Sequence, residues 1–408
     1  MKRIQNCKGI LSPAAIYIYL LIVSALLLYA AVVLYQFFPN MYTWEELFIN
    51  YEGGFIRRGL IGQLLFLANP FIPISICYLV LYAVLFYVFL FVSYNKLMNV
   101  FDPKVVAFIF ICPLIFLLPV TDRYVFGRRD LFIEILLLCI ALVCANSITK
   151  EGASLYKNTL AISFLFILGI LIHEMIILYF PPFAVLLGVA YARQRKIIQW
   201  LFIIGALFSG TLLLFAVIFV GDAGMGEAIC ASWRQSYPEL TCKRALRFIG
   251  ISLHFNIMNA FHYHTNWVII GSFFLGACLS SLPLLFLWKA YRPYAAIRDL
   301  LSASLVLRLA FWPAVSAPLI ALAINIDYGR FLSMALITYI FFLYVVFSAR
   351  PQPAAPWLYK FKEAIAVSPR LRYAAYFFAV AYGLCWRMIH FAPSGESLVI
   401  PGVLLYLQ

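Results

Sequence analysis

Charged residues are scarce in this chain. Asp, Glu, Lys and Arg make up only 11% of its 408 residues, and 65% of the residues are hydrophobic, whereas soluble domains are about 25% charged and about half apolar. A water-soluble globule cannot bury so much apolar surface, and disordered or fibrous chains need a polar or repetitive composition. No internal repeat or low-complexity segment is present. These absences predict an all-α, polytopic membrane protein, a bundle of transmembrane helices.

Acidic residues are the scarcest charged class. The chain has 30 Lys and Arg against 16 Asp and Glu, which gives a formal net charge of +14. In a soluble protein such an excess would suggest nucleic-acid binding, but in a membrane chain basic residues first set the orientation, because they are retained on the cytoplasmic side. We therefore expect no nucleic-acid partner.

Long apolar stretches predict the number of membrane spans. A spanning helix needs about 20 mostly apolar residues. Stretches of this kind begin near Ala14, Phe71, Val105, Leu131, Thr159, Ile176, Ile197, Trp267, Leu309, Phe331 and Tyr373. We therefore expect about eleven spans, the first of them a retained signal anchor.

The distribution of charge predicts the topology. Lys2, Arg3 and Lys8 precede the first span, which places the N-terminus in the cytoplasm and, with eleven spans, the C-terminus outside. Most other basic residues then fall in inner loops, and twelve of the 16 acidic residues fall at the outer side. We expect a multi-pass protein of a bacterial inner (cytoplasmic) membrane.

The predicted organisation is one integral membrane domain, residues 1–408. Residues 1–192 hold the first six spans with two charged outer loops, and residues 193–408 hold the last five with a long outer loop, 221–266. The stretch 159–192 is interrupted by polar residues and prolines, so it is either one broken span or two tight ones. If the stretch contains two spans, the basic residues that begin at Arg193 lie on the cytoplasmic side, as the distribution of charge requires. We therefore prefer two spans.

The nine cysteines include no Cys-x-x-Cys pair of the kind that binds zinc. Cys230 and Cys242 share the long outer loop. If that side is oxidising, the two can form a disulfide, and otherwise they are free thiols. The remaining cysteines lie in spans or near the inner side, where they act as small apolar residues.

The first charged cluster follows the first span. Glu45, Glu46 and Glu52 are followed closely by Arg57 and Arg58. Arginines at the outer side contradict the usual charge distribution, so the cluster is either a loop that neutralises itself by ion pairing or a binding and catalytic site. In the second case Glu52 is the candidate catalytic acid or base, and the arginines are candidate phosphate ligands.

The second cluster joins the third and fourth predicted spans. Its charged members are Asp122, Arg123, Arg128, Arg129 and Asp130, and Glu134 follows one helical turn later. Glu134 and Asp130 share a helix face. A carboxylate so close to the membrane pairs with an arginine or serves as a base or metal ligand. Asp122 and Glu134 are candidate catalytic residues, and Arg123, Arg128, Arg129 and Asp130 candidate substrate ligands.

Two smaller groups complete the outer charges. His173 and Glu174 are neighbours at the end of the fifth span, and because adjacent helical side chains diverge they are candidate single acid, base or substrate-binding groups. Asp327 and Arg330 lie between the ninth and tenth spans, as a local ion pair or as substrate ligands.

Apolar helices with carboxylates, arginines and aromatic residues gathered at their predicted outer ends suit lipid-linked sugar chemistry. The polyprenyl chain needs an apolar groove, its phosphate needs cations, and the acceptor hydroxyl must lose a proton to a base. Charges gathered at the outer rim also favour an enzyme over a transporter or lipid flippase, whose polar groups lie near the bilayer midplane.

The layout resembles the lipid-linked membrane glycosyltransferases of the GT-C class. These enzymes carry acidic residues in the first outer loop, here Glu45, Glu46 and Glu52, and in a second outer loop, here Asp122 and Asp130. The resemblance implies a polyprenyl-phosphate-linked donor and Glu52 or Asp122 as the base or metal-side acid. It also implies arginines around the phosphate and His173 and Glu174 near the acceptor.

No Asp-x-Asp motif is present, so a divalent metal is a possible but not a required cofactor. The chain also resembles the bacterial O-antigen and capsule polymerases, which have outer-face arginines and a long outer loop late in the chain. Both resemblances imply an active site on the periplasmic side.

Overall fold

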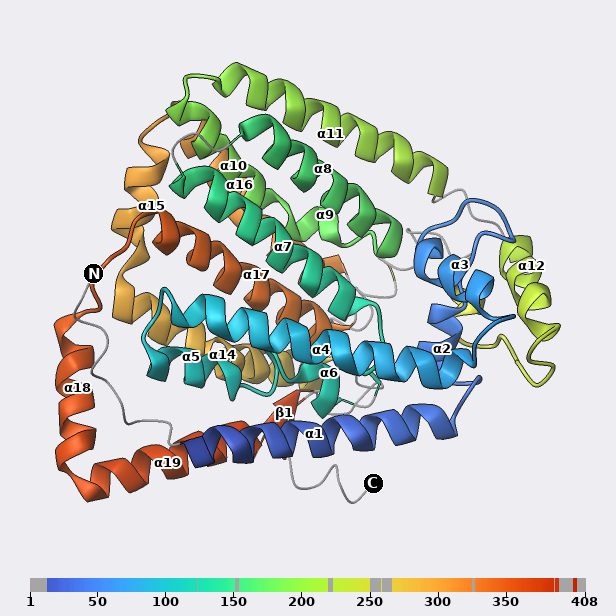
Figure 1. Cartoon of the computed structure of the whole chain (residues 1–408), viewed down its shortest axis with the longest axis horizontal. Helices are drawn as coiled ribbons and strands as arrows, with labels where there is room; N and C mark the ends of the chain where they lie inside the picture. The colour runs from blue at the N-terminus through green and yellow to red at the C-terminus, as the bar shows by residue number, and fades with distance from the viewer. Residues whose placement is uncertain are drawn as a thin grey trace.

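The structure is a computed structural model, and it describes residues 13–122, 124–150, 154–218, 223–249, 258, 266–324, 327–384, 386–388 and 399–401. This part of the chain is nearly all helical (Figure 1). Its one sheet is an antiparallel pair, β1 (Trp386–Met388) and β2 (Val399–Pro401). The expected all-α class is therefore confirmed apart from this short ribbon.

Eight helices in the described residues are long and apolar enough to cross a membrane. The helices are α1 (Pro13–Gln36), α4 (Ile74–Met98), α7 (Asp130–Thr149), α8 (Leu155–Ile172), α11 (Ile197–Ile218), α14 (Trp267–Tyr291), α16 (Leu305–Ile324) and α17 (Tyr328–Ala349). They correspond to eight of the eleven predicted spans. The protein is thus a multi-pass membrane protein, and the total of eleven crossings stays a prediction.

The other three predicted spans contain shorter helices. The segment near Val105 is split into α5 (Pro103–Phe110) and α6 (Leu118–Thr121), and the segment near Ile176 into α9 (Ile176–Tyr179) and α10 (Pro181–Arg193). The segment near Tyr373 is α19 (Pro369–Leu384). Prolines begin several of these pieces, because proline lacks an N–H and its ring clashes with the preceding turn.

The stretch 159–192 contains two helices that run in opposite directions, α8 and α10 (Figure 1). The chain reverses between His173 and Phe180, where the backbone leaves the helix and forms only the short α9. The stretch therefore holds two antiparallel helices rather than one continuous helix, and a membrane crossing by α10 stays a prediction.

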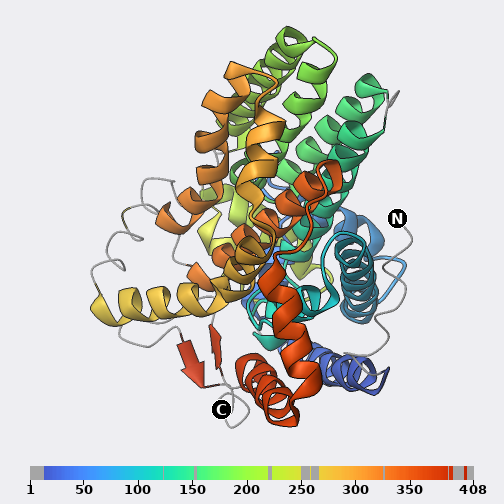
Figure 2. The same ribbon diagram turned by 90° about the vertical axis from the view of Figure 1, so that its left-hand side faces the viewer.

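Segments predicted for the same side of the membrane share one end of the bundle (Figure 1). One end carries α2 (Tyr42–Leu47), α3 (Gly59–Ala68), α12 (Ala223–Arg234) and the 3-10 helix η1 (Leu246–Phe248), and we call it the outer end. The opposite inner end carries α15 (Pro293–Leu301) and α18 (Pro356–Val367). Figure 2 looks onto the inner end, where α18 lies across the long helices. Which end faces the cytoplasm stays a prediction.

Helix α17 forms the centre of the bundle. It is enclosed by α7, α14 and α16, and it is buried on nearly all of its faces. A helix that is apolar all round lies in a protein core or in lipid, and α17 lies in the core. By contrast, α11 exposes Phe202 and Leu213, as expected of a helix that faces lipid. This arrangement places Arg330, in the first turn of α17, at the middle of the outer end.

Candidate functional site

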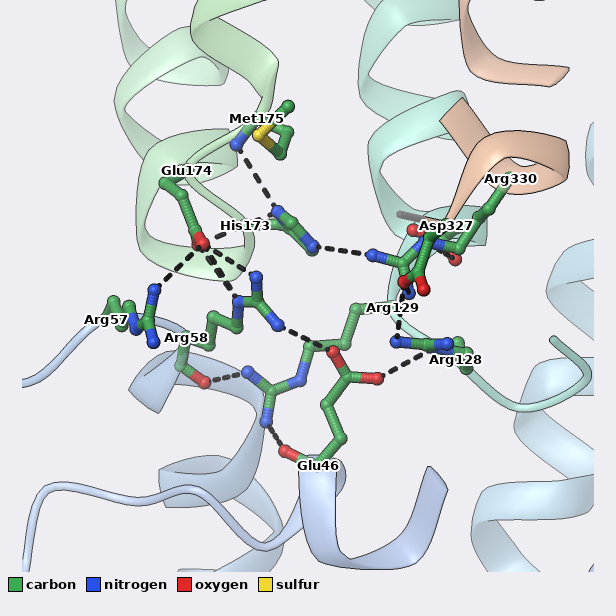
Figure 3. Close-up of polar contacts among 11 residues, drawn as sticks. Glu46, Arg57, Arg58, Arg128, Arg129, His173, Glu174, Met175, Asp327 and Arg330 are labelled. Atoms are coloured by element: carbon green, nitrogen blue, oxygen red, sulfur yellow. Dashed lines mark hydrogen bonds and ion pairs between the residues drawn. The ribbon is translucent and has the colours of Figure 1, made fainter. Parts of the chain in front are cut away.

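Charged side chains from separate segments converge at the outer end (Figure 3). We call this group the outer ionic network. Its members are Glu46, Arg57, Arg58, Arg128, Arg129, Asp130, His173, Glu174, Asp327 and Arg330. All four predicted clusters contribute to it, so residues that are far apart in the chain form one site.

Glu46 holds the centre of the network. Its Oε1 lies 3.1 Å from Nη1 of Arg58, and its Oε2 lies 2.9 Å from Nε of Arg128. Burial alone would raise the pKa of Glu46, but the charges of Arg128 and Arg58 outweigh burial and hold the pKa well below its ordinary value. Glu46 is therefore an ionised group that orients two arginines.

Arg58 connects Glu46 to Glu174. Its Nη2 lies 2.7 Å from Oε1 of Glu174, and its Nε lies 3.0 Å from Oε2, so the guanidinium fork grips the carboxylate with two donors. Arg57 reaches the same carboxylate more loosely, at 3.7 Å. Burial opposes the charge of Glu174, but Arg58 overrides it and holds the pKa of Glu174 well below its ordinary value.

The backbone at Arg58 explains this reach. Arg58 has φ 63° and immediately precedes α3, and such a left-handed conformation is uncommon for a residue with a side chain. The next residue must be small, since a Cβ on Gly59 would lie 2.1 Å from the ring of Tyr51. The loop is thus folded tightly enough to turn both arginines toward the bundle.

Arg330 connects the centre of the bundle to the network. Its Nη1 lies 3.1 Å from Oδ2 of Asp327, and its Nε lies 3.3 Å from Oδ2 of Asp130. Arg128 also approaches Asp327, at 3.8 Å. Gly127 has φ +77°, a conformation that glycine adopts readily, and it turns the chain before Arg128.

His173 lies between the two halves of the network. Its Nε2 is 3.3 Å from Nη2 of Arg330, and its Nδ1 accepts a hydrogen bond of 3.3 Å from the backbone N–H of Met175. Burial, and then the charge of Arg58, lower the pKa of His173 well below its ordinary value. The imidazole is therefore neutral, and it separates cations without adding another charge.

Arg129 has a different environment. Its side chain is completely buried and donates to the backbone carbonyls of Arg58 and Glu46. Burial lowers its pKa to about 10. Arg129 therefore connects the end of α2 and the start of α3 to α7. Its guanidinium also adds a positive charge to the network.

The network carries an excess of positive charge. Five arginines face four carboxylates, those of Glu46, Asp130, Glu174 and Asp327, and the histidine is neutral. Beside it is a small, partly open hollow, lined by Tyr42, Glu46, Ile49, Arg57, Arg58, Ala245 and Ile249. The excess positive charge beside this hollow favours an anion there.

The segment of α12 and η1 forms one wall of the hollow. Oε2 of Glu45 accepts hydrogen bonds from the backbone N–H groups of Arg244 (2.7 Å) and Leu246 (3.4 Å). Cys230 and Cys242 form a disulfide within the same segment, and Nε1 of Trp233 donates to the carbonyl of Phe48 at 2.7 Å. This wall is therefore fixed to α2 by several independent contacts.

Other predicted site residues lie outside the network. Glu52 is exposed and contacts Gln63 (3.4 Å). Asp122 is buried, and its carboxylate accepts the N–H of Tyr124 at 2.9 Å. Glu134 is buried within α7, and its Oε2 has no hydrogen-bond partner among the described residues. Arg123 lies outside the described residues.

The central role of Glu46 was not predicted, because Glu45, Glu46 and Glu52 have the same side chain in the same loop. Their orientation distinguishes them: α2 turns Glu46 toward the arginines and Glu45 toward η1. The aromatic residues of α2, Tyr42 and Trp44, give a signal that this segment packs inward, since both are bulky and α2 is buried.

The described residues do not fit a metal ion. In this part of the chain no three His, Cys, Asp or Glu side chains are grouped as metal ligands, and the carboxylates of the network are directed at arginines. The chain matches no known protein family, no curated protein and no solved structure. The site itself must therefore carry any functional conclusion.

Proposed function

We propose that this protein is a membrane glycosyltransferase of a bacterial inner membrane, which acts at the outer face on polyprenyl-phosphate-linked sugars in surface polysaccharide assembly. The observation that carries the proposal is the hollow beside Arg57 and Arg58, where the arginines of the outer ionic network outnumber its carboxylates at the end of an apolar helical bundle. A lipid-linked phosphate needs such a combination of cations and neighbouring apolar surface.

Arg57 and Arg58 are the proposed ligands of the phosphate. Both line the hollow, and they keep more of their side chains accessible (12% and 19%) than Arg128 or Arg330 do. A planar guanidinium binds two phosphate oxygens at once. In glycosyl transfer these groups would stabilise the negative charge that develops on the departing phosphate.

Helix α3 supports binding of the same phosphate and of its lipid chain. Its N-terminus follows Arg58 directly, so the positive end of the helix dipole adds to the arginine charge. Beyond it, Leu64, Leu67 and Phe71 are exposed apolar side chains, and a polyprenyl chain can lie along them. The head group and the tail of one lipid would thus contact consecutive parts of one segment.

Glu52 is the proposed proton acceptor for the acceptor hydroxyl. A carboxylate gripped by arginines, such as Glu46 or Glu174, is a weak base because its charged form is stabilised. Glu52 lies in the same loop as Arg57 but makes no ion pair with a described residue, and it is exposed. We derive no step through a metal, since the described carboxylates are not grouped to hold one.

A repeat-unit polymerase of the same pathway is the second candidate. The reliance of the network on arginines favours it, because such an enzyme also transfers a glycan from a polyprenyl diphosphate and needs cations at the leaving group. The two candidates share the binding site and differ in what is transferred. Transport of a lipid-linked glycan or small molecule is a third outcome that the same experiment detects.

The test is mass spectrometry of polyprenyl-linked glycans and of surface polysaccharide with and without the gene. A lipid-linked repeat that lacks one sugar supports the transferase, and complete single repeats without long chains support the polymerase. Unchanged pools, or complete chains trapped inside the cell, contradict both.

Variants Arg57→Ala and Glu52→Gln should reproduce the gene deletion while the protein still inserts. Lys360→Ala, at the inner end, is the matched control and should behave as wild type.

A further inference from the structure

Exposed basic residues border the hollow. Ala245 and Ile249 line the hollow, and between and beside them Lys243, Arg244 and Arg247 are exposed. No described carboxylate lies within ion-pair distance of these three side chains. We call Lys243, Arg244 and Arg247 the basic rim.

The basic rim faces water rather than lipid. Among the side chains that the structure describes in the segment 223–249, no large hydrophobic one is exposed, whereas the preceding α11 exposes Leu212 and Leu213. The segment holds four basic and two acidic residues, although it belongs to the predicted outer side, where basic residues do not serve orientation. Its charge therefore needs another explanation, and a partner in the aqueous phase provides one.

The basic rim is held in a fixed position relative to the network. The backbone of Arg244 is bound to the carboxylate of Glu45, whose neighbour Glu46 holds Arg58. Cys242, which precedes the rim, is tied to α12 by the disulfide. The backbone that carries these cations therefore loses little conformational freedom when their side chains bind a charged group.

We propose that the basic rim binds an anionic group, a carboxylate or a phosphate, on the sugar part of the substrate whose lipid-linked phosphate occupies the hollow. This inference rests on the proposed function and adds to it the substrate class: an acidic rather than a neutral glycan. Arg57 and Arg58 recognise the lipid phosphate, and the rim recognises the charge that projects beyond it into water.

The test compares two probes, farnesyl diphosphate linked to glucose and to glucuronic acid, on the purified full chain in nanodiscs of zwitterionic lipid. Three exposed ionic contacts predict that the acidic probe binds about tenfold more tightly at low salt. The preference should vanish in 0.5 M NaCl, where exposed charges are screened, and in the variant K243Q/R244Q/R247Q. It should persist in K360Q/R370Q/R372Q, a control at the inner side of the predicted topology.

Each outcome decides the inference. Equal affinity of the two probes for the wild type, or a preference that survives in the rim variant, overturns it while the proposed function stands. Failure of both probes to bind, or binding unaffected by Arg57→Ala, overturns the proposed function and the rim with it. Competition by phosphatidylglycerol added to the nanodiscs would assign the rim to lipid headgroups instead.

Discussion

Replacing Glu46 by glutamine removes the charge that holds Arg58 and the buried Arg128 together. The carboxylate lies 3.1 Å from Arg58 and 2.9 Å from Arg128, and its side chain is almost completely buried. Removal of one partner from a buried ion pair costs about 3–5 kcal/mol, because the remaining charge is left without compensation. The new amide also directs donor hydrogens at guanidinium groups that cannot accept them. We expect Glu46→Gln to lower the free energy of unfolding by this amount.

The assay is unfolding by titration with SDS in bicelles. Glu52→Gln makes the same chemical change in the same loop at an exposed position, so its effect should stay within about 0.5 kcal/mol. The pair is therefore a matched test of the network rather than of the loop.

A double-mutant cycle with Arg128→Gln isolates the central contact. Each single variant leaves the other residue without its ion-pair partner. The loss of unfolding free energy in the double variant should therefore be smaller than the sum of the losses in the two single variants, by about 0.5–3 kcal/mol. If Glu46→Gln unfolds like the wild type, or if the two effects are additive, Glu46 does not organise the network.

Three further predictions follow from the geometry. Gly127→Ala should lower the free energy of unfolding by more than about 1 kcal/mol, because a side chain is disfavoured at φ +77°. Gly205→Ala is the control, since the space around Gly205 is open, and it should not destabilise the fold. Thermal unfolding measures both effects. Because the pKa of His173 is lowered on folding, the unfolded chain binds the extra proton. Stability should therefore fall as the pH drops below about 6.5, and His173→Gln should flatten that slope in unfolding measured against pH. Cys230→Ser, which breaks the disulfide to Cys242, should cost about 2–3 kcal/mol and expose residues 223–249 to limited proteolysis; unchanged cleavage would contradict a pinning role.

The helical class and the outer position of the charges could be predicted because both follow from local composition. Apolar stretches of about 20 residues located eight long helices. The three exceptions, near Val105, Ile176 and Tyr373, show the limit of a length criterion, since proline and local packing divide or shorten a helix without making the stretch less apolar.

The partners within the network could not be predicted in the same way. Arg58 meets Glu174 across 116 positions of sequence, and Arg330 meets His173 across 157. Such pairings depend on how helices pack, and no local pattern encodes them. The sequence therefore identified the arginines as a group but favoured the exposed Glu52, whereas the structure places Glu46 at the centre.

The residues of the network are far apart in the sequence, and this separation has a consequence for biosynthesis. Glu46 and Arg58 emerge from the ribosome early, but Arg330 and Asp327 follow only after most of the other helices have been made. Until α17 is inserted, Asp130 lacks the guanidinium that faces it in the finished protein. The intermediate must keep these charges hydrated or shielded, and the last central helix then closes the site. Assembly of the outer end is thus completed late, once α17 brings Arg330 to Asp130.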